Sequence, residues 1–394
     1  IIIAQQSSDT TGEKEKENLM KKKIVSALLC VAMIATMVTG CGGSKSSSTS
    51  GNADSTAKQF EINAAIAANP PALDPHTVNA NVTGAIGIHI YEALFQMDEN
   101  YEPQPVLAES YEMSDDGKEY TIKLRQGVKF HNGDEMKADD VVASMNRWME
   151  LSPKAKTLIG GSVFEKVDDY TVKLTVNEPS SDIIMVLASP IQFAAIYPKS
   201  VVDSASDEGV KEYIGTGPYK VAEWKQDQYV KLEKNEDYHP AEGKSSGLAG
   251  AKNAQADTIT FNIVTDTATR IAGVQNGQYD IAEDIPADQY KDLAADKNLT
   301  MDVRSGGTLN LFLNTTEGVM ADEKVRQAAL AALNCDDILM ASYGDADLYK
   351  LNAGWCNPDD AQWGTEAGSE YYNQNDVEKA KKLLKKASDT EKDC

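Results

Sequence analysis

Histidine is scarce in this chain of 394 residues, which contains four copies. No two of them are four residues apart and none stands beside a cysteine, so the sequence predicts no preformed metal site. Cysteine is also sparse, because five copies in this length do not make a disulfide framework. A bridge between Cys335 and Cys356 is one pairing that the pattern leaves open.

Cationic side chains are in deficit. Lysine and arginine number 38 against 61 aspartates and glutamates, which gives a formal net charge of −23 at pH 7. Such a surface repels phosphate backbones, so nucleic acid is not an expected partner. The acidic residues are spread along the chain without long runs of a single charge. This pattern is typical of a soluble surface, and it indicates no particular ligand.

Motifs of the common enzyme classes are missing. The chain has no Gly-x-Ser-x-Gly elbow, no phosphate loop, no His-Glu-x-x-His and no dinucleotide fingerprint. Its many carboxylates mark no particular acid/base pair. We therefore expect a protein that is not an enzyme and needs no cofactor. Two alternatives of other classes stay open, a surface lipoprotein hydrolase and a purely structural envelope protein.

An export signal is present near the start. Three lysines at 21–23 precede the apolar run Ile24–Thr39, which is too short for a comfortable bilayer span but suits a signal peptide. The run ends at Gly40-Cys41, and this order resembles the lipobox of bacterial lipoproteins, whose cysteine carries diacylglycerol. The resemblance implies cleavage before Cys41 and a stable lipid anchor on its sulfur.

The segments on either side of this signal differ in composition. Residues 1–19 precede Met20 and carry acidic side chains that a signal peptide avoids, so we exclude them from the fold. We assign 20–40 to the signal peptide. Residues 41–58 are rich in serine and glycine with few apolar side chains, and they are predicted to form a flexible tether.

Strands and helices are predicted to be mixed along the chain from residue 60 onward. Apolar side chains alternate in the predicted strands and recur every three or four residues in the predicted helices. Strands are expected at 60–66, 120–124, 170–176, 229–233, 258–264 and 309–313. Helices are expected near 85–95, 138–145, 270–275, 322–333 and 376–387.

Several short segments occur in an order and at spacings that resemble the family 5 extracellular solute-binding proteins. The most distinctive block runs from Leu124 to Gly133 and is followed by Ala138–Val142. Further matching segments are Leu73–Pro75, Tyr91–Leu94, Pro105–Ser110, Gly215–Tyr219, Asn235–Tyr238, Gly277–Ala282 and Val325–Ala328. The chain departs from the family pattern at Tyr238–Pro240 and Leu333–Asp336, which look like structural positions.

The resemblance implies an α/β, two-lobed fold of the periplasmic-binding-protein type (type II), with a β-rich subdomain inserted in lobe I. Lobe I would comprise 59–103 and 213–303, the inserted subdomain 104–212, and lobe II 304–394. The family continues past the Lys-Lys-Leu-Leu segment at 381–384, so we expect a truncated chain with an incomplete second lobe. In the family's peptide binders the charged groups that pair with ligand termini lie largely beyond this segment.

Candidate ligand-binding residues follow from this resemblance and from side-chain chemistry. The polar loop 77–81 precedes a helix and would face the cleft, while a tryptophan would supply an aromatic wall for apolar groups. The candidates are Thr77, Asn79, Asn81, Thr216, Gly217, Asn310 and Trp355, with Cys41 as the lipidation site. Each of them also fits an ordinary role in a loop, a turn or a lobe interior.

The implied function is the capture of a small solute for an ABC importer. We expect a monomer, lipid-anchored on the extracytoplasmic face of the cell membrane, that delivers di- or oligopeptides to a permease after its lobes close. A receptor for a nickel chelate or another solute is the alternative within the same family. His76, beside the expected cleft loop, would then be the candidate metal ligand.

Overall fold

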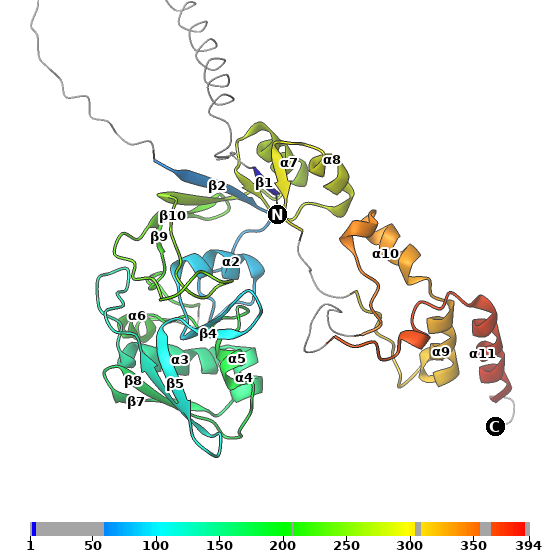
Figure 1. Ribbon diagram of the computed structural model, residues 1–394, viewed down its shortest axis with the longest axis horizontal. Coiled ribbons are helices and arrows are strands. Elements are labelled where there is room, and N and C mark those ends of the chain that lie inside the picture. Colours follow the sequence, from blue (N-terminus) through cyan, green and yellow to red (C-terminus); the bar gives the residue numbers. More distant parts are fainter. Residues whose placement is uncertain (1, 5–58, 207, 304–308, 355–363, 391–394) are drawn as a thin grey trace, which may run out of the picture.

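A computed structural model describes residues 2–4, 59–206, 208–303, 309–354 and 364–390. The predicted signal peptide, Cys41, the tether and Trp355 lie outside these residues. Within the described ranges, no helix is both long and apolar enough to span a bilayer. Figure 1 shows one body that holds the sheets and a group of C-terminal helices beside it.

The larger sheet is built around a buried central strand. Its order is β13-β1-β12-β2-β11-β10-β9, and β2 runs parallel to both of its neighbours while the other pairs are antiparallel. The strands are β1 (Ile2–Ala4), β2 (Glu61–Ile66), β9 (Tyr219–Lys225), β10 (Tyr229–Lys234), β11 (Thr258–Ile263), β12 (Ile281–Ala282) and β13 (Leu299–Met301). Ala64, Ala65 and Ile66 are buried, as a parallel strand covered on both faces requires.

Helices α2 (Asn81–Ile90), α7 (Thr267–Asn276) and α8 (Tyr290–Ala294), with the 3₁₀ turn η1 (Ala287–Gln289), accompany this sheet. Ile86 and Ile90 of α2 pack in one buried cluster with Val230 and Leu232 of β10. This cluster fixes α2 against the sheet, and the loop before α2 is thereby held at one edge of the body.

β1 differs from the expectation that residues 1–19 stay outside the fold. Ile3 pairs with Ile281 of β12 on one side and with Thr300 of β13 on the other. Ile2–Ala4 thus form a strand of the larger sheet.

A second core belongs to an antiparallel sheet of order β5-β6-β8-β7 that is packed against α3. Its strands, with the neighbouring pair β3 and β4, are β3 (Phe95–Met97), β4 (Pro103–Pro105), β5 (Ala108–Met113), β6 (Glu119–Leu124), β7 (Val163–Asp168) and β8 (Thr171–Thr175). The helices are α3 (Ala138–Leu151), α4 (Pro153–Ile159), α5 (Ile183–Leu187) and α6 (Lys199–Asp203). Val141, Met145 and Trp148 lie at helical spacing on the buried face of α3.

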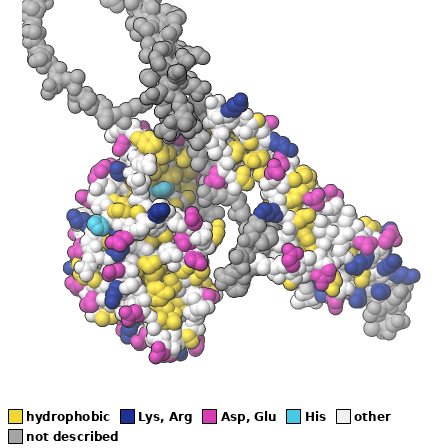
Figure 2. Space-filling model, in the orientation of Figure 1, with side chains coloured by type: hydrophobic (Ala, Val, Ile, Leu, Met, Phe, Trp, Pro, Cys, Tyr) yellow, Lys and Arg dark blue, Asp and Glu magenta, His cyan; other side chains and the backbone are white. Residues whose placement is uncertain are grey.

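Two of the C-terminal helices, α9 and α11, share a small core of alanines. The elements are η2 (Val319–Ala321), α9 (Glu323–Ala332), α10 (Cys335–Tyr343), η3 (Ala346–Leu348), η4 (Ser369–Tyr371) and α11 (Val377–Thr390). Ala328 and Ala331 of α9 pack against Ala380 of α11. In Figure 2 basic side chains gather at the α11 end, whereas acidic ones are scattered over the visible face, as the dispersed negative charge predicts.

Two predicted elements differ from the structure. The helix predicted over 85–95 ends at Ile90, because the Ile90 carbonyl accepts a hydrogen bond from the Gly217 amide (2.9 Å) and Tyr91 is extended. Residues 309–313 alternate like a strand but pair with no described strand. Phe312 in this segment is 80% exposed. The strand predicted at 309–313 is therefore absent from the described part of the chain.

Candidate functional site

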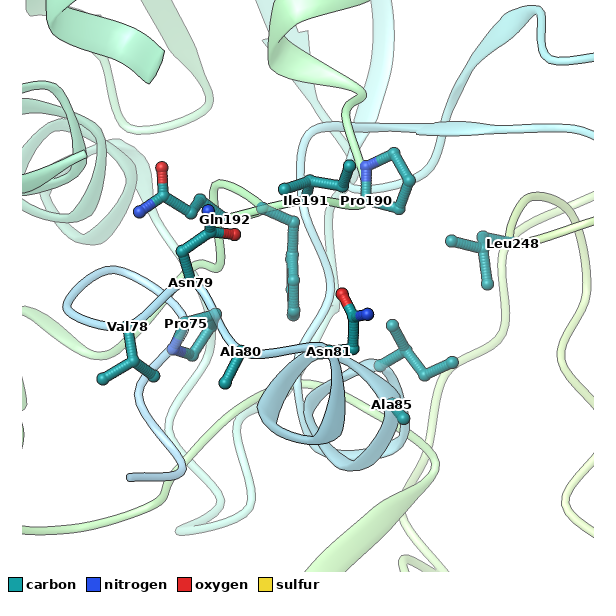
Figure 3. Close-up of a pocket in the computed structure, with 13 residues that line it drawn as sticks. Pro75, Val78, Asn79, Ala80, Asn81, Ala85, Pro190, Ile191, Gln192 and Leu248 are labelled. Carbon is teal, nitrogen blue, oxygen red and sulfur yellow. The ribbon is translucent and has the colours of Figure 1, made fainter. Parts of the chain in front are cut away.

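A hollow of about 250 Å³ opens between the start of α2 and the segment 190–193. Figure 3 shows Asn79 and Gln192 on one side of it, Leu248 facing them from the other, and Asn81 and Ala85 on α2. Its lining consists of Pro75, Val78, Asn79, Ala80, Asn81, Gly84, Ala85, Ile88, Pro190, Ile191, Gln192, Phe193 and Leu248. None of these side chains carries a charge. We refer to this hollow as the α2 pocket.

The glycines of α2 let the opposite wall approach the helix. A Cβ at Gly87 would lie 3.3 Å from the Phe193 ring, tighter than most real contacts, and a Cβ at Gly84 would lie 3.9 Å from the Pro190 carbonyl oxygen. Phe193 is consequently buried, with 3% of its surface exposed. Its ring and Ile88 give the pocket an apolar wall.

Gln192 presents a side-chain amide at the pocket from a strained backbone. Its φ of 49° lies in the left-handed region, which is uncommon for a residue other than glycine. The Trp148 indole N–H donates to the Gln192 carbonyl oxygen (2.7 Å), and the Ser152 hydroxyl donates to its Oε1 (3.1 Å). A backbone conformation of this kind persists only where surrounding contacts hold it in place, and such residues cluster at functional sites. Oε1 thus accepts one hydrogen bond inside the protein, and the amide NH₂ is a donor that a ligand carbonyl can use.

A buried ion pair braces the loop that carries Asn79. The Arg147 guanidinium donates to the Asp74 carboxylate (2.7 Å) and to Nδ1 of His76 (3.0 Å). The Tyr197 hydroxyl and the Val210 amide also donate to Asp74 (2.8 and 3.1 Å). Burial alone would raise the pKa of the Asp74 carboxyl, but the bond from Arg147 and the nearby positive charge outweigh it and lower the pKa below 3.8.

His76 is neutral and inaccessible in this network. It is fully buried, its Nε2–H donates to the Ala195 carbonyl (2.9 Å), and its Nδ1 accepts from Arg147. Burial lowers its pKa to about 3. Both ring nitrogens are therefore engaged, and neither is available to a metal chelate.

A second buried network joins the end of α2 to the Gly215–Gly217 loop. The Glu92 carboxylate accepts from the Thr216 hydroxyl (3.0 Å) and the Tyr238 hydroxyl (2.8 Å), and Lys252 Nζ lies 3.8 Å away. A Cβ at Gly217 would lie 2.5 Å from a backbone oxygen of α2, so only glycine fits this close approach. The loop 215–217 thus packs closely against the end of α2, and it does not line the α2 pocket.

The candidates from sequence divide between the pocket and the interior. Asn79 and Asn81 line the α2 pocket, whereas Thr77 caps its own loop by donating to the Asp74 carbonyl (3.1 Å). Thr216 is 1% exposed and Gly217 is packed against α2, so both have structural contacts in place of the ligand contacts expected for them. Asn310 is exposed away from the pocket lining, and Trp355 lies outside the described residues.

Sequence reasoning missed Gln192, Phe193 and Leu248. All three lie in irregular segments. Gln192 and Phe193 are more than 100 residues from Asn79 in the sequence, and Leu248 is more than 150 residues from it. Periodicity carries no information over such separations. Pro190 marks a turn, but a proline alone says nothing about which surface the turn adjoins. Only the packing of α2 brings these segments together.

A test of the buried imidazoles is the pH dependence of stability. His131 Nδ1 accepts from the Gly215 amide (3.2 Å) while its Nε2–H donates to the Gly217 carbonyl (3.0 Å), and burial lowers its pKa to about 4. Below about pH 6.5 the unfolded imidazole binds a proton that the folded one refuses, so the free energy of unfolding falls by up to about 1.4 kcal/mol per pH unit for each such histidine.

We expect the thermal midpoint to drop steadily from pH 6.5 to about pH 4, and His131→Gln to make that slope shallower than in the wild-type chain. The exposed His239 supplies the matched control, His239→Gln. The thermal midpoint is measured by circular dichroism. If its pH dependence were the same in His131→Gln as in the wild-type chain, His131 would not be a neutral imidazole with hydrogen bonds at both ring nitrogens.

The described residues thus form an uncharged pocket on an α/β body, and they contain no cluster of potential metal ligands. Residues 102–393 match the family described as bacterial extracellular solute-binding proteins, family 5 Middle, and the chain belongs to this family. It is 33% identical over 338 residues to the glutathione-binding protein GsiB of Salmonella paratyphi A, covering 83% of this chain and 61% of that protein. The chain thus spans about three fifths of the length of this curated relative.

Two solved structures of periplasmic binding proteins share the fold. DppA from Helicobacter pylori, in complex with peptide STSA, aligns with a TM-score of 0.65 and 27% identity, covering 84% of this chain and 66% of that one. AgaA from A. tumefaciens R10, in complex with agropinic acid, gives 0.66 and 28%, covering 83% and 64%. The expected α/β fold of the two-lobed periplasmic binding proteins is confirmed.

Proposed function

We propose that this protein captures peptides for an ABC importer and is held outside the cytoplasm by a lipid on Cys41. The observation that carries the proposal is the α2 pocket, where the amides of Asn79, Asn81 and Gln192 stand beside an apolar wall. A peptide combines backbone amides with apolar side chains, and a pocket of apolar surface with a few placed polar groups matches that combination.

The contacts of His76 favour a peptide over a nickel chelate. Both of its ring nitrogens are hydrogen-bonded inside the protein, and the described residues contain no cluster of potential metal ligands. The similar protein DppA was solved with peptide STSA, which agrees with a peptide ligand here. Glutathione, named for the relative GsiB, is itself a short peptide and belongs among the ligands to test.

A thermal-shift screen of the full-length protein tests this proposal. Di- to pentapeptides, glutathione, a nickel–histidine chelate, an opine and an oligosaccharide would each be added in excess. A ligand at 100 times its dissociation constant stabilises the folded state by about 2.7 kcal/mol, so the thermal midpoint should rise clearly with peptides. Chromatography of the recovered peptides distinguishes binding from hydrolysis.

Uncleaved peptides that raise the midpoint support the proposal. A shift with the chelate alone supports the alternative receptor, turnover supports the surface hydrolase, and no shift with any solute contradicts peptide capture. The anchor has a separate test, since Cys41→Ala should move the protein from the membrane fraction to the soluble fraction of the producing cells. Retention of that variant in the membrane would contradict the anchor.

A further inference from the structure

The α2 pocket has no charge with which to pair a charged ligand group. Its lining contains no Asp, Glu, Lys, Arg or His. The ion pair of Asp74 and Arg147 lies beneath the loop, but the two charges satisfy each other and Asp74 is buried. Lys154 stands behind the opposite wall, where its ammonium group donates to the buried Ser189, and it does not line the pocket.

The size of the pocket limits what it can hold. Its volume of about 250 Å³ is below the range of about 300–1,000 Å³ that holds a drug-sized ligand. It therefore accommodates one or two side chains and not a whole peptide. The wall of Phe193, Ile88 and Leu248 is apolar, and the polar groups at its rim are neutral amides.

From these observations we propose that the α2 pocket is a side-chain subsite that selects an uncharged, apolar residue of the ligand, with Leu248 as its specificity-determining residue and Gln192 as a donor to the ligand backbone. This inference rests on the proposed peptide capture. A charged side chain placed here would lose its hydration without gaining a counter-charge, which makes it a poor ligand. Ser152 donates to the side-chain oxygen of Gln192 and Trp148 donates to its backbone carbonyl, and these two bonds hold the residue in place. Its amide NH₂ is a donor that pairs with a carbonyl of the ligand backbone.

The test uses the full-length protein and tripeptides that carry leucine, lysine or glutamate at each position in turn, with alanine elsewhere. Isothermal titration calorimetry should show one position at which the leucine peptide binds at least about tenfold more tightly than the lysine or glutamate peptide. There leucine gains an apolar contact, whereas the charged side chains lose their hydration without finding a counter-charge. Leu248→Glu should then make lysine the preferred residue at that position and leave the other two positions unchanged.

Leu158→Glu is the matched control, because Leu158 is 53% exposed on α4 and does not line the pocket. It should keep the wild-type preference. Equal affinities for leucine, lysine and glutamate at every position of the wild-type protein would overturn the inference, and so would a Leu248→Glu variant with unchanged preference. If no tripeptide binds the wild-type protein, peptide capture itself fails, an outcome distinct from binding without charge discrimination.

Discussion

Arg147→Met is expected to lower the free energy of unfolding by about 3–5 kcal/mol, because it leaves the buried carboxylate of Asp74 without a counter-charge. Asp74 is 1% exposed, and its strongest partner is the Arg147 guanidinium at 2.7 Å. Methionine fills much of the volume of the arginine stem, so the loss reports the charge and its hydrogen bonds more than a cavity. Urea denaturation followed by fluorescence measures the change.

A surface ion pair gives the matched control for this substitution. Lys199 and Asp203 are joined at 2.6 Å, but their side chains are 51% and 58% exposed. Lys199→Met should therefore stay close to wild type, because exposed pairs contribute little. If both variants lost the same small amount, the Asp74–Arg147 pair would not be the brace of the pocket loop.

Glu92→Ala is expected to lower the free energy of unfolding by a similar amount, about 3–5 kcal/mol, since it leaves the buried ammonium group of Lys252 without a counter-charge. Within the described part of the chain Lys252 Nζ has no hydrogen-bond partner, and Glu92 is the carboxylate beside it at 3.8 Å. Burial lowers the pKa of Lys252, and the charge of Glu92 opposes that shift. The substitution also removes the acceptor for Thr216 and Tyr238.

The double variant Glu92→Ala with Lys252→Met separates these contributions. Removing both charges should restore part of the stability, because the penalty of an unpaired buried charge disappears. Losses that simply add in the double variant would mean that Lys252 and Glu92 do not interact. Glu92→Gln, which keeps the shape and one acceptor oxygen, should fall between Glu92→Ala and wild type.

Local sequence patterns predicted much of the fold. The helix expected at 138–145 is the start of α3, and the strand expected at 120–124 lies within β6, because their periodicities report which face is buried. The helix expected from 85 to 95 was too long, since a hydrogen bond from Gly217, far along the chain, ends it at Ile90. Tertiary contacts decided that boundary.

The same limit applies to the site. Asn79 and Asn81 were predicted because they belong to the polar segment 77–81, and both line the pocket. Thr216 was an equally plausible polar residue, but its hydroxyl is taken by Glu92, 124 residues away in sequence. The chemistry of a side chain can be read from the sequence, whereas the partner that uses up its hydrogen bond comes from the fold.

The side-chain amide resonances of the full-length protein give the most direct measurement of whether a peptide occupies the α2 pocket. On titration with a peptide that raises the thermal midpoint, we predict that the amide signals of Asn79, Asn81 and Gln192 shift. The amides of Asn146 and Asn235, which donate to Phe164 and Gly217 in the interior, should stay in place. Saturating peptide that leaves all three pocket amides unmoved would contradict the assignment of this site.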